Sequence, residues 1–436
     1  ASQRAAALVL TAAMLTTLAA PAFADIWHIE NGDITISAGE SGNNVTQNNN
    51  TTYGDTNTII TNQNKDTASS HTVTIEAKDK DDKVEVTLKD VNIDTSSRNK
   101  AAVSVTGEGD TNIKLDGDNA LKSDIYRSGI YGSGSLTISG GENDSLTAQG
   151  GSGANGISSS GSLTISGGTV TANGDDGGRG ISSSGSVTIS GGSTVTANGG
   201  SGTISGGDGI WSGGGVTISG GSTVTANGGN GGSLVGGDGI RSGGGLTVSD
   251  GTVTAKGGNG DSKDGYGGDG IRSGGVVTIS GNTVNAAGGY GGKVGGYGIC
   301  SFDRVAISGG TVEAAGGNGS TGGGSGIYSS VIDLSGSLEL TAKAGSPTGK
   351  ALLQNGRELD LDTIKDKLGP GAKVTATDAN GDSKQVSIPR PVEPEEPVIP
   401  EESSSSSDGG SATPSAPVSP LPGLTVTDKD GQRISY

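Results

Sequence analysis

A Gly-Ile pair recurs eight times along the middle of this chain, and the residues that follow the pair recur with it. The isoleucines of the eight pairs are Ile130, Ile157, Ile181, Ile210, Ile240, Ile271, Ile299 and Ile327. The intervals between them are 27, 24, 29, 30, 31, 28 and 28 residues. Repetition with a period of this size is typical of a solenoid, in which each turn buries its apolar side against its neighbours.

Each repeat contains three short stretches that carry its apolar residues. In the second repeat these are Ile157, then Leu163 with Ile165, then Val170 with Ala172. Alternation with a period of two puts the apolar residues on one face of a β-strand. Glycines between the stretches permit positive φ values at the corners. The predicted fold is therefore all-β: a right-handed, three-sided parallel β-helix (β-solenoid) with about five small aliphatic side chains per turn in a narrow core.

Composition alone would suggest a different answer. Glycine supplies 85 of 436 residues, and Leu, Ile, Val and Phe together supply about 19%, which is near the limit for a disordered chain. Collagen is excluded because glycine keeps no three-residue period. Disorder would not preserve aliphatic residues in phase over eight repeats, so we expect an ordered solenoid.

The ends of the chain differ from the repeats. Residues 1–24 resemble an N-terminally truncated signal peptide, with Arg4, an apolar stretch and an Ala22-Phe23-Ala24 cleavage site. We expect the parallel β-helix over residues 25–345, a C-terminal cap with a short helix and a hairpin over 346–388, a disordered Pro/Glu/Ser-rich linker over 389–423, and the start of a truncated further module over 424–436. The expected location is extracellular, on a bacterial surface, with no membrane span. Cys300 is the single cysteine, so no internal disulfide can form.

Aspartate precedes the Gly-Ile pair in three successive repeats, as Asp208, Asp238 and Asp269. In a solenoid these carboxylates would stack about 4.8 Å apart and repel one another. Oxygen ligands on glycine-rich loops suit Ca²⁺, which makes the three residues candidate calcium ligands. The alternative is that they point into water or bond to the backbone of neighbouring turns.

The residue after the isoleucine forms a second column. Its members include Tyr131, Trp211, Arg241, Arg272 and Tyr328. Aromatic rings can stack on sugars, and arginines can pair with the carboxylates of an acidic glycan, so these five are candidate carbohydrate-binding residues. The long loops before the Gly-Ile pairs are a further sign of a binding side.

Other functions find less support in the sequence. Paired threonines such as Thr169 and Thr171 could bind ice, but the column is interrupted at Asn285 and Glu313. A calcium-dependent polysaccharide lyase would need Arg241 or Arg272 as a base. Nucleic acid is disfavoured as a partner by the net charge of -18.

Residues 84–93, 101–105, 112–121 and 134–141 (Gly-Ser-Leu-Thr-Ile-Ser-Gly-Gly) resemble a clostridial cell-surface family labelled carbohydrate-binding domain-containing proteins. The resemblance covers roughly residues 25–345. It implies a right-handed parallel β-helix that binds calcium and plant cell-wall polysaccharides, pectin-like or cellulose-like.

Together these observations predict a non-catalytic, secreted or cell-surface module that binds polysaccharide with the help of calcium, and we expect it to be a monomer. The second interpretation is a passive stalk or adhesin that presents another module.

Overall fold

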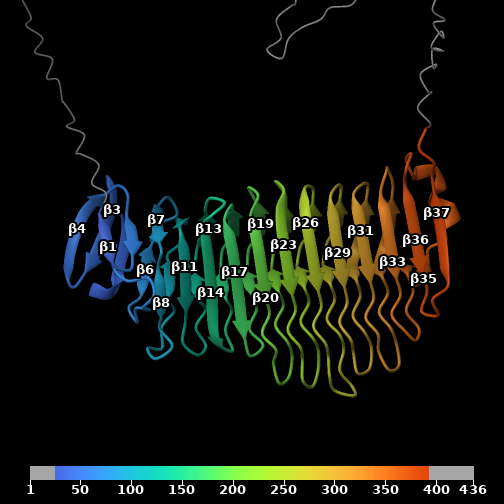
Figure 1. Cartoon of the computed structure of the whole chain (residues 1–436), viewed down its shortest axis with the longest axis horizontal. Helices are drawn as coiled ribbons and strands as arrows, with labels where there is room; N and C mark the ends of the chain where they lie inside the picture. Colours follow the sequence, from blue (N-terminus) through green and yellow to red (C-terminus); the bar gives the residue numbers. More distant parts are fainter. Residues whose placement is uncertain (1–24, 392–436) are drawn as a thin grey trace, which may run out of the picture. The chain divides into compact units, whose positions relative to one another are not determined.

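A computed structural model describes residues 25–391 and shows a β-solenoid of about 11 turns, with 51% strand and 3% helix (Figure 1). Each regular turn contributes three strands, so the predicted three-sided parallel β-helix is confirmed. The predicted signal peptide, linker residues 392–423 and residues 424–436 lie outside the described part. No helix within it is both long and apolar enough to cross a bilayer.

Three faces run the length of the solenoid, and each strand pairs in parallel with its equivalents in the neighbouring turns. The first face contains β2 (Ile34–Gly39), β6 (Val73–Glu76), β9 (Val103–Thr106), β12 (Ile130–Gly132), β15 (Ile157–Ser159), β18 (Ile181–Ser183), β21 (Ile210–Ser212), β24 (Ile240–Ser242), β27 (Ile271–Ser273) and β34 (Leu352–Gln354). The second contains β1 (Ile26–His28), β5 (Ile59–Thr61), β7 (Lys83–Lys89), β10 (Asp110–Asp116), β13 (Ser135–Ser139), β16 (Leu163–Ser166), β19 (Val187–Ser190), β22 (Val216–Ile218), β25 (Leu246–Val248) and β28 (Val277–Ile279). The third contains β8 (Asn92–Asp94), β11 (Asp118–Lys122), β14 (Ser145–Ser152), β17 (Thr169–Asp175), β20 (Thr194–Asn198), β23 (Ser222–Asn227), β26 (Gly251–Lys256), β29 (Thr283–Ala287), β31 (Thr311–Ala315), β33 (Glu339–Lys343) and β36 (Lys373–Thr377).

Two long strands join the first and second faces. The beginning of β30 (Ile299–Ile307) pairs with β27 and its end pairs with β28, and β32 (Ile327–Leu334) pairs along β30. The first two faces therefore form one hydrogen-bonded sheet.

Both ends of the solenoid carry antiparallel strands and short 3-10 helices. At the N-terminal end, η1 (Ile29–Asn31) precedes β2, which pairs antiparallel with β3 (Gly42–Gln47), as β3 does with β4 (Asn50–Asp55). At the C-terminal end lie β35 (Arg357–Glu358), η2 (Leu361–Lys367) and a hairpin of β36 with β37 (Ser383–Ser387). Solenoid pairing thus continues beyond residue 345, through β34 and β36.

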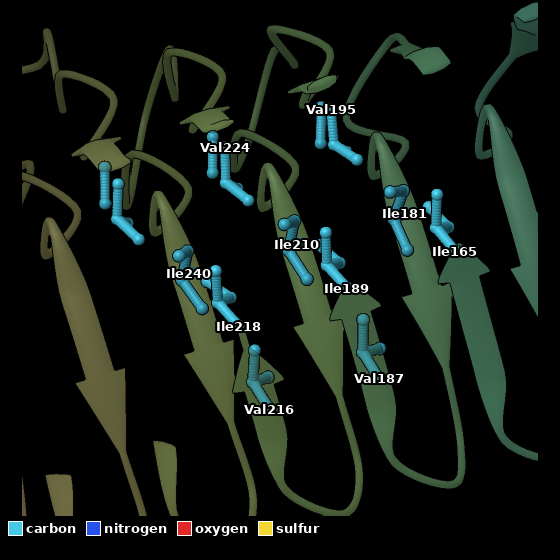
Figure 2. Close-up of a cluster of buried hydrophobic side chains, with 14 of the residues drawn as sticks. Ile165, Ile181, Val187, Ile189, Val195, Ile210, Val216, Ile218, Val224 and Ile240 are labelled. Atoms are coloured by element: carbon cyan, nitrogen blue, oxygen red, sulfur yellow. The ribbon is translucent and has the colours of Figure 1, made fainter. Parts of the chain in front are cut away.

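The core consists of stacked columns of small aliphatic side chains. Ile157, Leu163, Ile165, Val170 and Ala172 of the second repeat are all fully buried, as predicted. Figure 2 shows how equivalent residues of successive turns, such as Ile181, Ile210 and Ile240, lie one behind another. Burying each Val, Leu or Ile contributes about 1.5–3 kcal/mol.

The glycines serve two separate purposes. At the corner between the second and third faces they adopt positive φ, as Gly167 (85°) and Gly168 (72°) do. In the loops between the third face and the next Gly-Ile pair, glycines instead form two Gly-Gly-x-Gly segments per turn. We call these the outgoing arms (residues 199–202, 228–231, 257–260, 288–291 and 316–319) and the returning arms (206–209, 236–239, 267–270, 295–298 and 323–326). Figure 1 shows their loops as parallel extensions on one side of the strands.

Backbone hydrogen bonds connect the arms into one layer. The amide of Gly237 donates to the carbonyl of Gly229 in the same loop, and the amide of Gly258 in the next loop donates to the carbonyl of Gly237, each at 2.8 Å. The same zigzag of bonds runs from Gly200 to Gly345. Successive amides of one arm point to the next turn, to the opposite arm and to the previous turn, a threefold pattern like that of polyproline II.

The first, second and fourth positions of the arms are glycine because a side chain there would collide with neighbouring backbone. A Cβ atom on Gly237 would lie 1.9 Å from the carbonyl oxygen of Gly207, and one on Gly258 would lie 1.9 Å from that of Gly229. Neither residue has a positive φ that would itself demand glycine. The arms are thus a closely packed backbone layer and not flexible connections.

We therefore predict that Gly237→Ala destabilises the protein by about 3 kcal/mol or more, because backbone atoms must move to admit the methyl group. The matched control is Gly221→Ala, at a corner with φ of 71° and no atom within 4 Å of the added Cβ. It should cost only about 1–2 kcal/mol, the penalty of a left-handed backbone. Thermal melting of both variants measures the difference; equal losses would contradict close packing of the arms.

Candidate functional site

The third residue of the first four returning arms points away from the glycine layer into a groove beside the first face. The groove has a volume of about 800 Å³ and crosses six successive turns, from Asn155 to Tyr297. Asp208, Asp238 and Asp269 lie along it, together with three arginines. The glycine layer positions these side chains because its hydrogen bonds hold each arm in register with the next.

One oxygen of each aspartate binds the backbone of the next turn. Oδ1 of Asp208 accepts from the amide of Asp238 at 2.9 Å, and Oδ1 of Asp238 accepts from that of Asp269 at 2.7 Å. The series ends where Oδ1 of Asp269 accepts from the amide of Tyr297 at 2.7 Å. The three carboxylates thus form a ladder of bonds between turns, and the aspartates are only 4–6% exposed. Bonding to the backbone of neighbouring turns was one of the alternatives that the sequence left open.

The second oxygen of each aspartate faces a guanidinium group. Nε of Arg179 lies 3.3 Å from Asp208 Oδ2, and Nη1 of Arg272 lies 3.3 Å from Asp269 Oδ2. The ion pair of Arg241 with Asp238 is longer, at 4.0 Å. The arginine side chains are 37–50% exposed and those of the aspartates 5–8%. A molecule that enters the groove therefore meets guanidinium groups first.

Burial makes the ladder sensitive to pH. It raises the pKa of Asp269 to about 6, against the opposing effects of the Tyr297 amide and Arg272. Burial also raises the pKa of Asp238 well above its usual value, and the neighbouring carboxylates of Asp269 and Asp208 raise it further.

Arg272 is not suited to act as a base. Burial lowers its pKa, but the carboxylates of Asp269 and Asp238 oppose this and leave the pKa above its ordinary value. The guanidinium thus stays protonated, whereas a lyase of the kind considered above requires an arginine that loses its proton.

Aromatic rings continue the groove along the first face. Trp211 lies in register between Ser182 and Arg241, and the guanidinium of Arg179 sits 4.4 Å from the centre of its ring. At the other end Tyr297 stacks on Tyr328, with ring centres 5.0 Å apart and planes inclined by 15°.

The structure thus brings most of the candidate residues together. The three aspartates, Arg241 and Arg272 line the groove, Trp211 adjoins it through Arg179, and Tyr328 adjoins it through Tyr297. Tyr131 lines a second depression instead, and is three turns from Trp211 along the column. Cys300, next in the column after Arg272, is buried, and burial raises the pKa of its thiol to about 12.

Sequence reasoning did not single out Arg179 as a groove residue. It occupies the ladder position one turn before Asp208. Its backbone amide donates to Oδ1 of Asn155, the equivalent residue of the preceding turn, at 2.8 Å. The signal was its position immediately before a Gly-Ile pair. Tyr297 occupies the same position in its own turn, within one of the long loops that the sequence suggested as a binding side.

The opposite side of the glycine layer carries a similar ladder of neutral residues. Oδ1 of Asn230 accepts from the amide of Asn259 at 2.8 Å, and Oδ1 of Asn259 accepts from that of Tyr290 at 2.9 Å. An asparagine amide therefore makes the same bond between turns that an aspartate makes in the groove.

Calcium binding to the aspartates remains a prediction. Within residues 25–391 there is no group of three or more His, Cys, Asp or Glu side chains arranged to hold a metal ion. Each Oδ1 already binds an amide and each Oδ2 faces an arginine, so a cation at the ladder would have to displace guanidinium groups.

No family model, curated protein or solved structure matches this chain.

We predict that Asp238→Asn stabilises the protein at pH 8, because burial and the neighbouring carboxylates raise the pKa of Asp238 and so make its ionised form unfavourable in the folded state. The amide oxygen can still accept from Asp269, the buried charge is removed, and only the long, half-exposed contact to Arg241 is lost.

The raised pKa of Asp238 also determines how the stability of the folded protein changes with pH. A carboxyl group whose pKa is raised by folding stabilises the folded state below its unfolded pKa, and this stabilisation is lost as the pH rises through the folded pKa. The wild-type melting temperature should therefore fall between pH 4 and pH 8 more steeply than that of Asp238→Asn. Asp261→Asn, at an exposed loop residue, is the control. Destabilisation by Asp238→Asn at pH 8 would show that ion pairing outweighs burial.

Proposed function

We propose that the groove binds a linear acidic polysaccharide whose chain runs parallel to the solenoid axis. The observation that carries the proposal is the row of partly exposed Arg179, Arg241 and Arg272 above a buried carboxylate ladder. Equivalent residues of successive turns lie about 4.8 Å apart, so the six turns of the groove offer roughly 24 Å of continuous surface.

The arginines would supply the recognition of charge. Each guanidinium has five N–H donors in a planar fork, and its contact with one aspartate oxygen leaves others for sugar carboxylates and hydroxyls. The aspartates beneath hold the forks in position, so less side-chain freedom is lost on binding.

The aromatic residues would supply apolar contact. The ring of Trp211 already lies against Arg179, and the Tyr297–Tyr328 stack stands at the far end of the groove. A ring within the arginine row and a ring pair beyond its end suit a chain that alternates apolar ring faces with charged groups. The proposed binding breaks no bond, so the module is non-catalytic.

The resemblance in sequence supports the same kind of ligand. It also implies calcium assistance, which we keep as a secondary proposal. A second candidate function is the passive stalk or adhesin, favoured by the continuous hydrogen-bonded length of the solenoid. Extracellular location and a monomeric state are expected for both functions.

We predict binding to polygalacturonate or alginate, and weaker binding to neutral hydroxyethyl cellulose, measured by isothermal titration calorimetry with calcium and again with a chelator. Trp211→Ala and Arg241→Gln should each weaken binding about five- to tenfold, which corresponds to about 1 kcal/mol. Loss of binding in chelator alone would support the calcium proposal.

The control for charge is Arg304→Gln, which removes an exposed arginine from the end of β30 that belongs to the second face. It should leave the affinity unchanged. If neither acidic polymer binds, with or without calcium, the proposed function is wrong and the stalk remains.

Binding should strengthen by about two- to threefold or more as the pH falls from 8 to 5.5. Asp269, with a pKa of about 6, then gains a proton, so the groove loses a negative charge and Arg272 loses a competitor for the ligand. Sugar carboxylates have pKa values of about 3–4, so they stay ionised between pH 8 and pH 5.5. In Asp269→Asn the same titrations should show a smaller pH dependence, because only Asp238 of the raised pair is left to titrate. Weaker binding at pH 5.5 in the wild type would contradict the assignment.

A further inference from the structure

A second depression lies on the first face, toward the N-terminus from the groove. Its volume is about 640 Å³, and it crosses four turns. Lys100, Tyr126, Arg127 and Tyr131 are its largest lining side chains. Within the part of the chain that the structure describes, no carboxylate lines it.

This depression and the groove belong to one column of the solenoid. The outward residues of the first face are paired in register from turn to turn, in the order Thr74, Ser104, Tyr131, Ser158, Ser182, Trp211, Arg241 and Arg272. The first four line the depression, and the last two line the groove.

Tyr126 stands where the two hollows meet. A Cβ atom on Gly153, which lines the groove, would lie 3.0 Å from ring atoms Cδ1 and Cε1 of Tyr126, which lines the depression. Residues that line the two hollows therefore lie next to each other, and the turn of residues 153–158 contributes to both. The turns at the depression have no glycine arms of the later kind, and Tyr126 lies on the side where an arm would stand.

The groups that the depression offers are suited to the same ligand as the groove. Tyr126 is 76% exposed although its φ of 58° is unusual for a bulky residue. Arg127 donates Nε to the neutral side chain of Asn99 at 3.2 Å, and Lys100 pairs with Asp33 at 2.9 Å. An exposed ring next to a guanidinium whose bonded partner is uncharged can contact a sugar face and its carboxylate together.

We propose that the depression extends the groove, so that one polysaccharide chain occupies both and contacts nine successive turns. This inference rests on the proposed function. The combined track is roughly 38 Å long, from eight steps of about 4.8 Å. A chain held in the groove reaches the depression at high effective concentration, so the second hollow strengthens binding of long chains without affecting short ones.

The experiment compares oligogalacturonides and alginate oligomers of increasing length with the corresponding polymers, by calorimetry on the full chain. The test variant is Arg127→Gln with Tyr131→Ser, chosen because the register neighbours of Tyr131 are Ser104 and Ser158. The control is Tyr53→Ser with Arg304→Gln, which makes the same changes at exposed residues outside the track.

For the wild type we expect affinity to rise with chain length and then level off. The test variant should bind short oligomers like the wild type, bind polymers about tenfold more weakly, and cover fewer sugar units per protein at saturation. Wild-type affinity that does not depend on length, or unchanged polymer binding by the test variant, would overturn the inference and leave the proposed function intact. Absence of binding at every length would overturn both.

Discussion

Hydrogen bonding between the backbones of successive turns is the interaction on which the rest of this structure depends. On the three faces it pairs strands in parallel, and in the loops it connects glycine arms through bonds such as that from Gly258 to Gly237. The aliphatic core is narrow, so side-chain burial alone would not fix where each turn lies along the axis. Registered bonds on both the strands and the arms do so, and every column of equivalent side chains follows from that register.

The groove is a direct consequence of this register. A returning arm without side chains at its paired glycines can approach the preceding arm closely, which leaves only its third residue free to point outward. In three turns that residue is aspartate, and each carboxylate bonds the next amide while it orients an arginine. The exposed charges of the groove are therefore held by buried ones, which in turn are held by the backbone.

The fold could be predicted because its determinants are side chains. Inward residues such as Ile157 and Val170 alternate with polar ones, and eight repeats keep them in phase. The arms could not be predicted in the same way, since glycine has no apolar or polar side to alternate. A buried serine column on the first face was also missed: Ser183, for example, donates to the carbonyl of Gly161 at 2.8 Å, yet serine in a sequence suggests an outward position. For the site, column membership could be inferred from spacing, which also puts Arg179 one repeat of 29 residues before Asp208. Their ion pair could not be inferred, because spacing does not show which group the second oxygen of a carboxylate faces.

The two sides of the glycine layer bear on whether the protein is only a stalk. On the outgoing side Asn230 and Asn259 make the bond between turns with neutral amides, at no electrostatic cost. On the returning side Asp208 and Asp238 make the same bond with carboxylates, whose burial close to one another is unfavourable. A stalk would need only the first solution. The aspartates gain a role when their second oxygens fix the arginines of the groove, which is what a surface for an anionic chain requires.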